Sequence, residues 1–408
     1  MKQKTTSNPR YKSICLPWES EAEYLSCVND SDKFRQFIEE KRELYPELFP
    51  SAISGGFNLH DKYYSIKLGY HLRRIKLKAT KKVYQVRPSN VLPYLSGKTD
   101  EVEKALFLRQ WGVPFEALAY CFGRDAMYFY RMWVSLGRNQ IVGTTVKKEE
   151  KLPQHLIADE KHTWHLGEKN YLATTVAQGC FLGASLCEEA GTESLEKGYQ
   201  VFFSEAQEIK EDYEPETVCT DGWKATLEAW RNLFPTIVLI RCFLHAVLKI
   251  KSFTRKEIKK ESCRKAWEVY QAPKKVEFSQ RMRRFKEWAE KKTSGKVQEM
   301  ILKLCGLKKE FMVAFDYPQA ARTSNGLDRL MDYQDRVLYS MRYFHGKRES
   351  AELAVRAMAV QWNFHPYSLR AQHNGVESSP FAALNGFQYQ ENWLHNLLCA
   401  ASMGGRRL

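Results

Sequence analysis

Between Leu156 and Cys242 the sequence alternates short apolar runs with amphipathic stretches in an order that few folds accommodate. Three β-type runs come first, followed by a helical stretch, a fourth run, a second helical stretch and a fifth run. Apolar runs bounded by turn residues predict strands, and a 3.6-residue apolar period predicts helices. The order therefore predicts an α/β layered fold. Strands are expected at Leu156–Asp159, Tyr171–Val176, Gly179–Cys187, Thr217–Asp221 and Thr236–Cys242, with helices at Ser194–Lys210 and Trp223–Leu233.

Two of these predicted strands end in an aspartate. Asp159 closes the first strand and is followed by Glu-Lys-His-Thr-Trp, and Asp221 closes the fourth and is followed by Gly-Trp-Lys. Strand-end carboxylates on one sheet can converge, and paired carboxylates suit Mg²⁺, which takes oxygen ligands. An aspartate at a strand end is also a common turn or helix-cap residue, so each position alone leaves a structural role open.

The chain is basic, with a formal net charge of +15, and its cations cluster. Between Lys62 and Lys82, Lys and Arg alternate with apolar residues and no acid intervenes, which predicts a β-ribbon with one cationic face. An ordinary solvated strand face is the alternative. The cations of this segment are Lys62, Lys67, Arg73, Arg74, Lys76, Lys78, Lys81 and Lys82. Among them, we expect Arg73, Arg74 and Lys76 to contact DNA.

A second candidate for DNA binding begins at Thr99. A helical pattern runs to Trp111-Gly112, Pro114 opens a short second helix, and Gly123 marks a turn before a third helix to about Leu136. This order is typical of a helix-turn-helix, although three-helix packing units without DNA-binding function are common. Three arginines in and after the third helix favour DNA contact: Arg124, Arg131 and Arg138.

Composition excludes several protein classes. No apolar run approaches the roughly 18 residues of a transmembrane helix, and no apolar segment follows the basic N-terminus as a secretory signal requires. The ten cysteines lack a Cys-x-x-Cys pair, so we expect reduced thiols in a cytoplasmic protein associated with the nucleoid.

Four motifs together resemble the DDE/D transposases of prokaryotic insertion sequences, in the branch related to Mutator-type elements. They are Cys219-Thr-Asp-Gly-Trp-Lys-Ala-Thr, Leu233-Phe-Pro, Ile240-Arg-Cys-Phe-Leu-His245 and Arg322-Thr-Ser-Asn-Gly-Leu-Asp-Arg329. The resemblance covers about residues 150–365. It implies an RNase H-like catalytic domain over 148–408 with a helical insertion at about 244–316, preceded by a basic region over 1–97 and a helix-turn-helix over 98–147.

The resemblance also implies residue roles. Asp159, Asp221 and Asp328 match the three catalytic acids and would bind two Mg²⁺, with Mn²⁺ as a possible substitute. The family usually has glutamate at the third position, so Glu377 and Asp332 are alternatives to Asp328.

The pair Cys242 and His245 matches the family's Cys-x-x-His motif. These two residues provide only half of a zinc site. We therefore expect Cys242 to pack at a strand end and His245 to make a hydrogen bond or a phosphate contact to DNA.

The function implied is Mg²⁺-dependent DNA cleavage and strand transfer at terminal inverted repeats by a dimer or larger assembly. The basic insertion would contact the phosphates of flanking or target DNA. Two alternatives stay open: a nuclease of the same fold without strand transfer, and a DNA-binding regulator derived from a transposase. No membrane association is expected.

Overall fold

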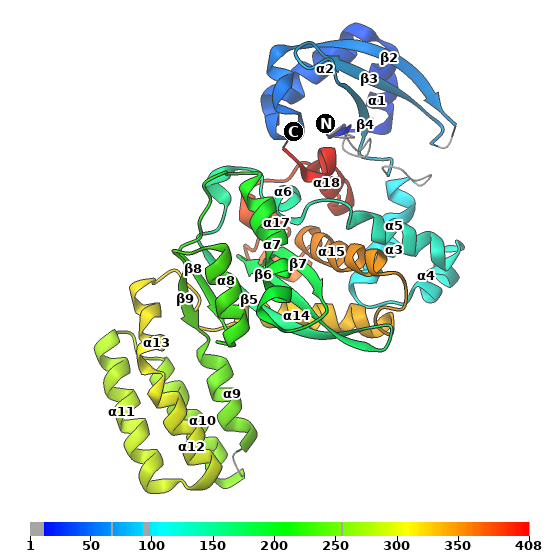
Figure 1. Cartoon of the computed structure of the whole chain (residues 1–408). Coiled ribbons are helices and arrows are strands. Elements are labelled where there is room, and N and C mark those ends of the chain that lie inside the picture. Colours follow the sequence, from blue (N-terminus) through cyan, green and yellow to red (C-terminus); the bar gives the residue numbers. More distant parts are fainter. Residues whose placement is uncertain (1–11, 67, 93–97, 254–255, 408) are drawn as a thin grey trace, which may run out of the picture.

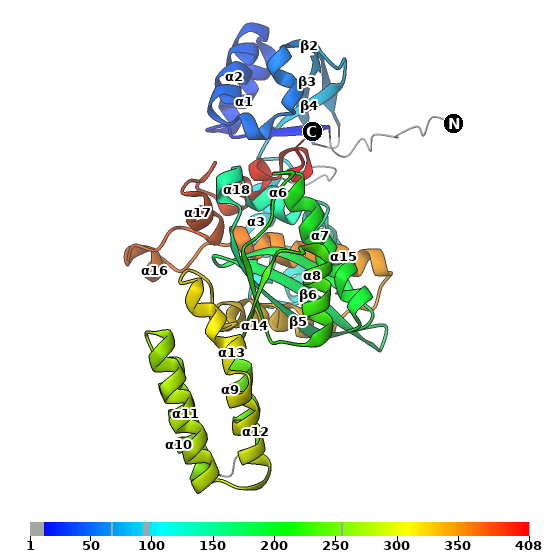
Figure 2. The ribbon, with the colours of Figure 1, turned by 60° about the vertical axis from the view of Figure 1, so that its left-hand side comes forward.

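The computed structural model describes residues 12–66, 68–92, 98–253 and 256–407, and its mixed α/β architecture has three visible parts. A small N-terminal sheet with two helices lies at one end, a larger sheet covered by helices lies in the middle, and a helical arm projects from the far end (Figure 1). The same arrangement is visible after rotation in Figure 2. The predicted α/β class is thus confirmed, whereas Lys67, Arg255 and the boundary proposed at residue 97 lie outside the described residues.

The central sheet has five strands in the order β7-β6-β5-β8-β9. Its first three strands form an antiparallel meander, and β8 and β9 continue the sheet parallel to β5. The helical stretches between β7, β8 and β9 provide the crossovers that parallel strands require. The strands are β5 (His155–His165), β6 (Glu168–Ala177), β7 (Cys180–Cys187), β8 (Thr217–Thr220) and β9 (Val238–Arg241).

The prediction that the first strand ends at Asp159 was wrong, because β5 continues to His165. Its pairing with β6 runs on to the register His165↔Glu168, and this hairpin extends the strand. Pairing with β8 stops at Ile157↔Cys219. Asp159 therefore lies inside β5 but just beyond the end of the parallel part of the sheet.

Helices cover both faces of this sheet. Helices α7 (Thr192–Gln207) and α8 (Lys224–Leu233) pack on one face through a buried cluster that includes Tyr199 and Trp230. Helices α14 (Asn325–Ser340) and α15 (Arg348–Phe364) pack on the other. Because neighbouring strand residues point to opposite faces, Asp159 faces the α14 side and Glu160 the α7 side.

The arm follows β9 and spans the stretch for which the sequence predicts a helical insertion. It has a hydrophobic core of its own, and it returns to the central region just before α14. Its helices are α9 (Phe243–Phe253), α10 (Lys256–Tyr270), α11 (Lys275–Lys292), α12 (Gly295–Gly306) and α13 (Lys308–Met312).

The N-terminal part is a four-stranded sheet of order β1-β4-β3-β2 backed by two helices. The predicted basic ribbon is the antiparallel pair β2 and β3. The sequence analysis did not anticipate β1, which pairs with β4 across more than 70 residues of chain. The elements are β1 (Ser13–Leu16), α1 (Glu21–Asn29), α2 (Ser31–Leu44), β2 (Phe57–Ser65), β3 (Tyr70–Leu77) and β4 (Val83–Pro88).

Three helices, α3 (Thr99–Gln110), α4 (Phe115–Phe122) and α5 (Ala126–Leu136), connect this part to the central sheet. Helix α5 packs closely on α15. The Trp133 indole donates a 2.7 Å hydrogen bond to Gln361, and a Cβ on Gly137 would lie only 1.9 Å from the Leu353 carbonyl oxygen. The three helices therefore share a core with the central region.

The remaining elements are short. They are α6 (Ile141–Thr145), α16 (Leu369–His373), α17 (Pro380–Asn385) and α18 (Trp393–Ala400), with 3-10 turns at Pro46–Leu48, Ser51–Gly55, Glu149–Lys151, Val313–Asp316 and Ser402–Gly405. Among the described helices, none has the length and apolar character needed to cross a bilayer.

Candidate active site

Asp159 and Asp221 extend from neighbouring strands at the same edge of the central sheet. Asp221 directly follows β8, and the register Ile157↔Cys219 places each aspartate two residues beyond one paired position. Neighbouring strands lie about 4.8 Å apart, so the two carboxylates share one electrostatic environment. In agreement, the charge of Asp221 raises the pKa of Asp159.

The Asp159 carboxylate is mostly buried and is held on both sides. Its Oδ1 accepts a 2.9 Å hydrogen bond from the Glu160 backbone, and its Oδ2 lies 3.7 Å from Nε2 of His245. Burial raises the pKa of Asp159 to about 6, although nearby His245 opposes the shift. A cation at this carboxylate would offset the cost of keeping it charged.

The loop after β8 fixes Asp221. Its Oδ1 accepts a 2.6 Å hydrogen bond from the Trp223 backbone, just before α8 begins. Gly222 has φ +84°, and a Cβ there would lie 2.6 Å from the Arg241 guanidinium, which donates to the Gly222 carbonyl at 3.2 Å. Arg241 also pairs with Glu310 of the arm. Glycine adopts this left-handed turn without strain and leaves room for the Arg241 guanidinium, in agreement with the Asp-Gly-Trp sequence.

Asp328 lies in the first turn of α14, which packs beside β5. The start of α14 is held against the sheet because the Ser324 backbone N–H donates to Cys242 Sγ at 3.1 Å and a Cβ on Gly326 would lie 3.3 Å from Ile157 Cδ1. Burial and Cys242 raise the pKa of Asp328, and His245 lowers it. Asp328 therefore lies within the electrostatic reach of the residues around Asp159.

The alternatives to Asp328 lie elsewhere. Glu377 is exposed in the loop between α16 and α17. Asp332 is exposed one helical turn beyond Asp328 and raises the pKa of Asp328 by like-charge repulsion. His245 lowers the pKa of Asp328, so this acid lies within the electrostatic reach of His245.

The carboxylates of this site are ligands of the type that bind Mg²⁺. Within the described part of the chain, one carboxylate oxygen of Asp159 and one of Asp221 accept no backbone hydrogen bond, and such oxygens are the ligands that Mg²⁺ prefers. Within residues 12–66, 68–92, 98–253 and 256–407, no three His, Cys, Asp or Glu side chains are grouped tightly enough to hold a metal ion.

Cys242 and His245 link the sheet to the arm. Cys242 is buried at the end of β9, as expected, and its Sγ lies 3.4 Å from the Ser324 hydroxyl. Hydrogen bonds from Cys219, His245 and Ser324 lower the pKa of Cys242 to about 3. The neighbouring Cys242 sulfur raises the pKa of His245 to about 9, so the imidazole carries a positive charge at neutral pH.

Glu160 is a buried acid that the sequence analysis did not single out. Its Oε1 accepts hydrogen bonds from the Tyr199 hydroxyl at 2.6 Å and the Thr226 hydroxyl at 2.7 Å. Burial raises the pKa of Glu160 to about 7. The residue ties β5 to both α7 and α8 directly behind Asp159. The only sequence feature that could have identified Glu160 is its position next to Asp159, a candidate catalytic acid.

The three cations of the N-terminal ribbon that are predicted to contact DNA differ in their surroundings. Arg73 is buried, and its Nε donates to the Val28 carbonyl at 2.6 Å. Arg74 forms an ion pair with Asp61, the residue immediately before the acid-free segment. Lys76 is partly exposed on β3. Arg73 therefore has a structural role, and the ribbon is less cationic than its sequence indicates.

Two of the arginines predicted to contact DNA from the three-helix segment lie on its outer surface. Arg131 is exposed on α5, and Arg124 is exposed beside Tyr128 and forms a 3.4 Å ion pair with Glu101.

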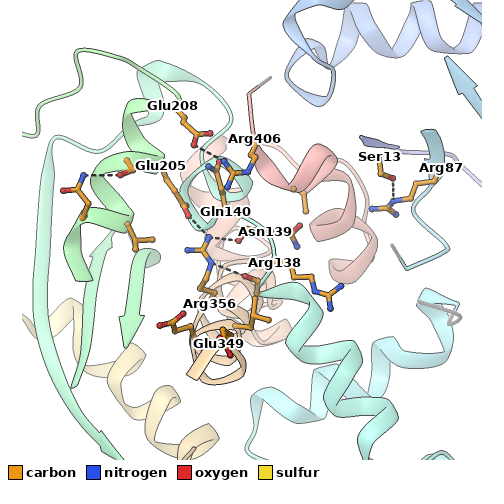
Figure 3. A pocket seen from close by; sticks show the side chains of 18 residues that line it. Ser13, Arg87, Arg138, Asn139, Gln140, Glu205, Glu208, Glu349, Arg356 and Arg406 are labelled. Atoms are coloured by element: carbon orange, nitrogen blue, oxygen red, sulfur yellow. Dashed lines mark hydrogen bonds and ion pairs between the residues drawn. The ribbon is translucent and has the colours of Figure 1, made fainter. Parts of the chain in front are cut away.

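The third, Arg138, is also exposed and lines a cavity of about 540 Å³ between the N-terminal sheet and α7 (Figure 3). There Arg356 donates to the Asn139 carbonyl at 2.9 Å and pairs with Glu205, and Glu349 shares the cavity. Arg138 is therefore in mixed acidic and basic surroundings.

The arm is basic, but many of its cations are paired along the helices. Such pairs of neighbouring turns stabilise a helix and reduce its net positive field. The pairs are Arg264–Glu268, Arg281–Glu277, Arg283–Glu287, Lys286–Glu290 and Lys296–Glu299.

No protein-family model matches the sequence, and no curated protein matches it. A functional assignment therefore rests on the residues of this chain.

Proposed function

We propose that the protein is a DDE/D-type DNA transposase with an RNase H-like catalytic core. The observation that carries the proposal is the placement of Asp159 and Asp221 at one edge of two adjacent parallel strands, with His245 3.7 Å from Asp159 and α14 packed alongside. An antiparallel three-stranded meander continued by two parallel strands is the strand arrangement of RNase H-like enzymes, and it supports the proposal.

In this proposal Asp159, Asp221 and Asp328 hold two Mg²⁺ ions, with Mn²⁺ as a substitute. When bound, such ions activate a water or a 3′-hydroxyl and stabilise the leaving oxygen of a phosphodiester. The protein's own residues orient the acids: the Glu160 backbone holds Asp159, and the Gly222 turn holds Asp221. The charged His245 places a cation beside the acids, where it can contact a DNA phosphate.

DNA binding is assigned to three surfaces. Strands β2 and β3 and the helix-turn-helix candidate α3–α5 would recognise terminal inverted repeats, with Lys76, Arg124, Arg131 and Arg138 as accessible cations. The arm would contact flanking or target DNA through its phosphates. Because two element ends must be cut together, a dimer or larger assembly on DNA is part of the proposal.

Cleavage of DNA that carries the inverted repeats flanking the gene tests the proposal. Asp159→Asn and Asp221→Asn should each abolish Mg²⁺-dependent cleavage while binding to the same DNA stays within a few-fold. Asp212→Asn, at an exposed surface position, is the matched control and should cleave normally. Normal cleavage by either active-site variant would reject the assignment.

Strand transfer is a separate measurement. Pre-cut ends should join to a target duplex if the protein is a transposase, whereas a nuclease of the same fold would cleave without joining. A DNA-binding regulator would do neither, under any divalent cation.

A further inference from the structure

A cavity of about 630 Å³ opens beside α14, one helical turn from Asp328. Arg329, Asp332 and Arg336 of α14 form one wall, the end of α3 forms a second, and the segment from Trp362 to Gln372 forms the third. Because an α-helix rises about 1.5 Å per residue, the Asp332 wall begins about 6 Å along the helix from Asp328. Whatever occupies the cavity would therefore lie next to the candidate active site.

Aromatic rings form much of the cavity. The His365 ring stacks on Phe107 with centroids 4.7 Å apart and lies edge-on to Trp111 at 5.9 Å. Trp111 is 54% exposed, which is unusual for tryptophan, and the Arg336 guanidinium covers it at 5.2 Å. These flat surfaces suit a planar ligand that stacks.

Two polar atoms in the cavity wall lack partners. Gln110 and His365 are only 5% and 6% exposed. Within the described part of the chain, their atoms Gln110 Oε1 and His365 Nε2 are buried and form no hydrogen bond. Burial lowers the pKa of His365 to about 4, so its ring is neutral at pH 7 and can donate or accept a proton in a hydrogen bond. Because buried polar groups are normally hydrogen-bonded, a shift of these two side chains toward a ligand with a polar edge would satisfy both atoms.

We propose that this cavity binds one unstacked nucleobase of the DNA strand that the enzyme cuts. A base provides a planar face that can stack on the exposed Trp111, and the exposed Arg329 provides a cation for the adjoining phosphate. The ligand assignment rests on the proposed function, because only a DNA-cutting enzyme brings a strand to Asp328.

The test compares two single strands of equal length in the absence of divalent ions, one of oligothymidylate and one of abasic sugar phosphates. Their affinity ratio cancels the phosphate contacts that the strands share. Trp111→Ala should lower the oligothymidylate affinity about 5- to 150-fold and leave the abasic strand unchanged. Trp111→Phe, which keeps a stacking ring, should restore most of the ratio.

Trp164→Ala is the matched control, because Trp164 is 44% exposed on β5 and does not line the cavity. It should leave both affinities unchanged. The proposal would be overturned if Trp111→Ala lowered the affinity for both strands equally, or lowered neither affinity. Thymidine monophosphate that binds as tightly as the strand would also overturn it, because the site would then serve a free nucleotide.

The two proposals can fail separately. If Trp111→Ala changes the affinity ratio of the two strands but the protein shows no metal-dependent cleavage, the base site is supported and the transposase assignment is rejected. If cleavage requires Asp159 but Trp111→Ala leaves the affinity ratio of the two strands unchanged, the transposase assignment stands and the base site is rejected.

Discussion

Nε2 of His245 lies 3.7 Å from Oδ2 of Asp159, which joins the first helix of the arm to the central strand of the sheet. His245 is the third residue of α9, and Asp159 lies on β5 beyond the end of the parallel pairing. Because the pKa of His245 is raised to about 9, chiefly by the neighbouring Cys242 sulfur, the contact joins a cation to a buried carboxylate. Any movement of the arm on DNA would thus reach the candidate active site directly.

The first prediction concerns the charge of His245. His245→Ala should slow single-turnover DNA cleavage at least tenfold and reduce the slope of log affinity against log salt by about 0.9, the value for one lost phosphate contact. Gel-shift titrations at several salt concentrations measure the slope. His345→Ala, at an exposed histidine after α14, is the control and should change neither quantity. An unchanged slope with slow cleavage would assign His245 to positioning Asp159 alone.

The second prediction concerns the turn at Gly222. Gly222→Ala should destabilise the fold by about 1–3 kcal/mol, because it adds left-handed strain and a clash with Arg241. Gly123→Ala is a matched control, since Gly123 also has positive φ but has open space around its Cα. It should cost only the backbone strain, about 1–2 kcal/mol. Urea unfolding measures both, and cleavage should fall only in the Gly222 variant.

Local patterns in the sequence were sufficient to predict the element order of the central sheet. The extent of β5 was not predictable, because it depends on the partner β6 beyond Asp159. The roles of Arg73 and Arg74 also escaped prediction. The partner of Arg74, Asp61, lies just outside the acid-free segment, and Val28, the partner of Arg73, lies 45 residues away.

The candidate site, too, was predictable from the sequence only in part. Asp159 and Asp221 are visible in the sequence because each lies at or near the end of a β-type run. The hydrogen bonds of Glu160 to Tyr199 and Thr226 involve residues 39 and 66 positions away, so only the folded chain brings them together. Pairings between distant segments carry no periodic signal in a single sequence.

The third prediction separates structural from DNA-binding cations in the ribbon. Arg73→Ala should destabilise the protein by about 1–3 kcal/mol, because it leaves the buried Val28 carbonyl without its donor. Lys76→Ala should leave stability within about 0.5 kcal/mol and reduce the salt slope of DNA binding by about 0.9. Thermal unfolding and salt titrations distinguish the two. A large loss of stability in Lys76→Ala would contradict the assignment.

The fourth prediction is a pH dependence of stability caused by Lys147. This buried amine donates to the carbonyls of Gly143 at 2.8 Å and Ala400 at 2.6 Å. Burial lowers its pKa to about 7, although Glu47 raises it and Arg407 lowers it further. Between pH 7 and the usual lysine pKa of 10.5, the unfolded chain therefore binds a proton that the folded chain does not.

The free energy of unfolding should then rise with pH across this window, by at most about 1.4 kcal/mol per pH unit from this group. Lys147→Met should remove that rise, so the stability difference between variant and wild type should shrink or change sign between pH 7 and pH 9. Cys399 also lies close enough to raise the pKa of Lys147, and Cys399→Ser controls for its contribution. A constant difference would show that the two carbonyls keep the amine protonated.

The fifth prediction assigns the third acid. Ser324 and Gly326 fix the start of α14 against Cys242 and Ile157, and this places Asp328 beside the sheet edge. Asp328→Asn keeps the size of the side chain and removes its charge, so it should abolish cleavage while costing only about 0.3–1 kcal/mol of helix N-terminal stabilisation.

Glu377→Gln should retain most of the cleavage activity, because Glu377 is exposed in the loop between α16 and α17. Asp332→Asn tests the neighbouring acid on the same helix, and we expect only a modest effect on cleavage, from the lost like-charge repulsion on Asp328 and from its place in the cavity wall. Single-turnover cleavage and far-UV circular dichroism on the same samples separate catalysis from folding. If Glu377→Gln is inactive while folded Asp328→Asn still cuts DNA, the third acid is Glu377, and the chain between α15 and α17 must approach the sheet edge when DNA binds.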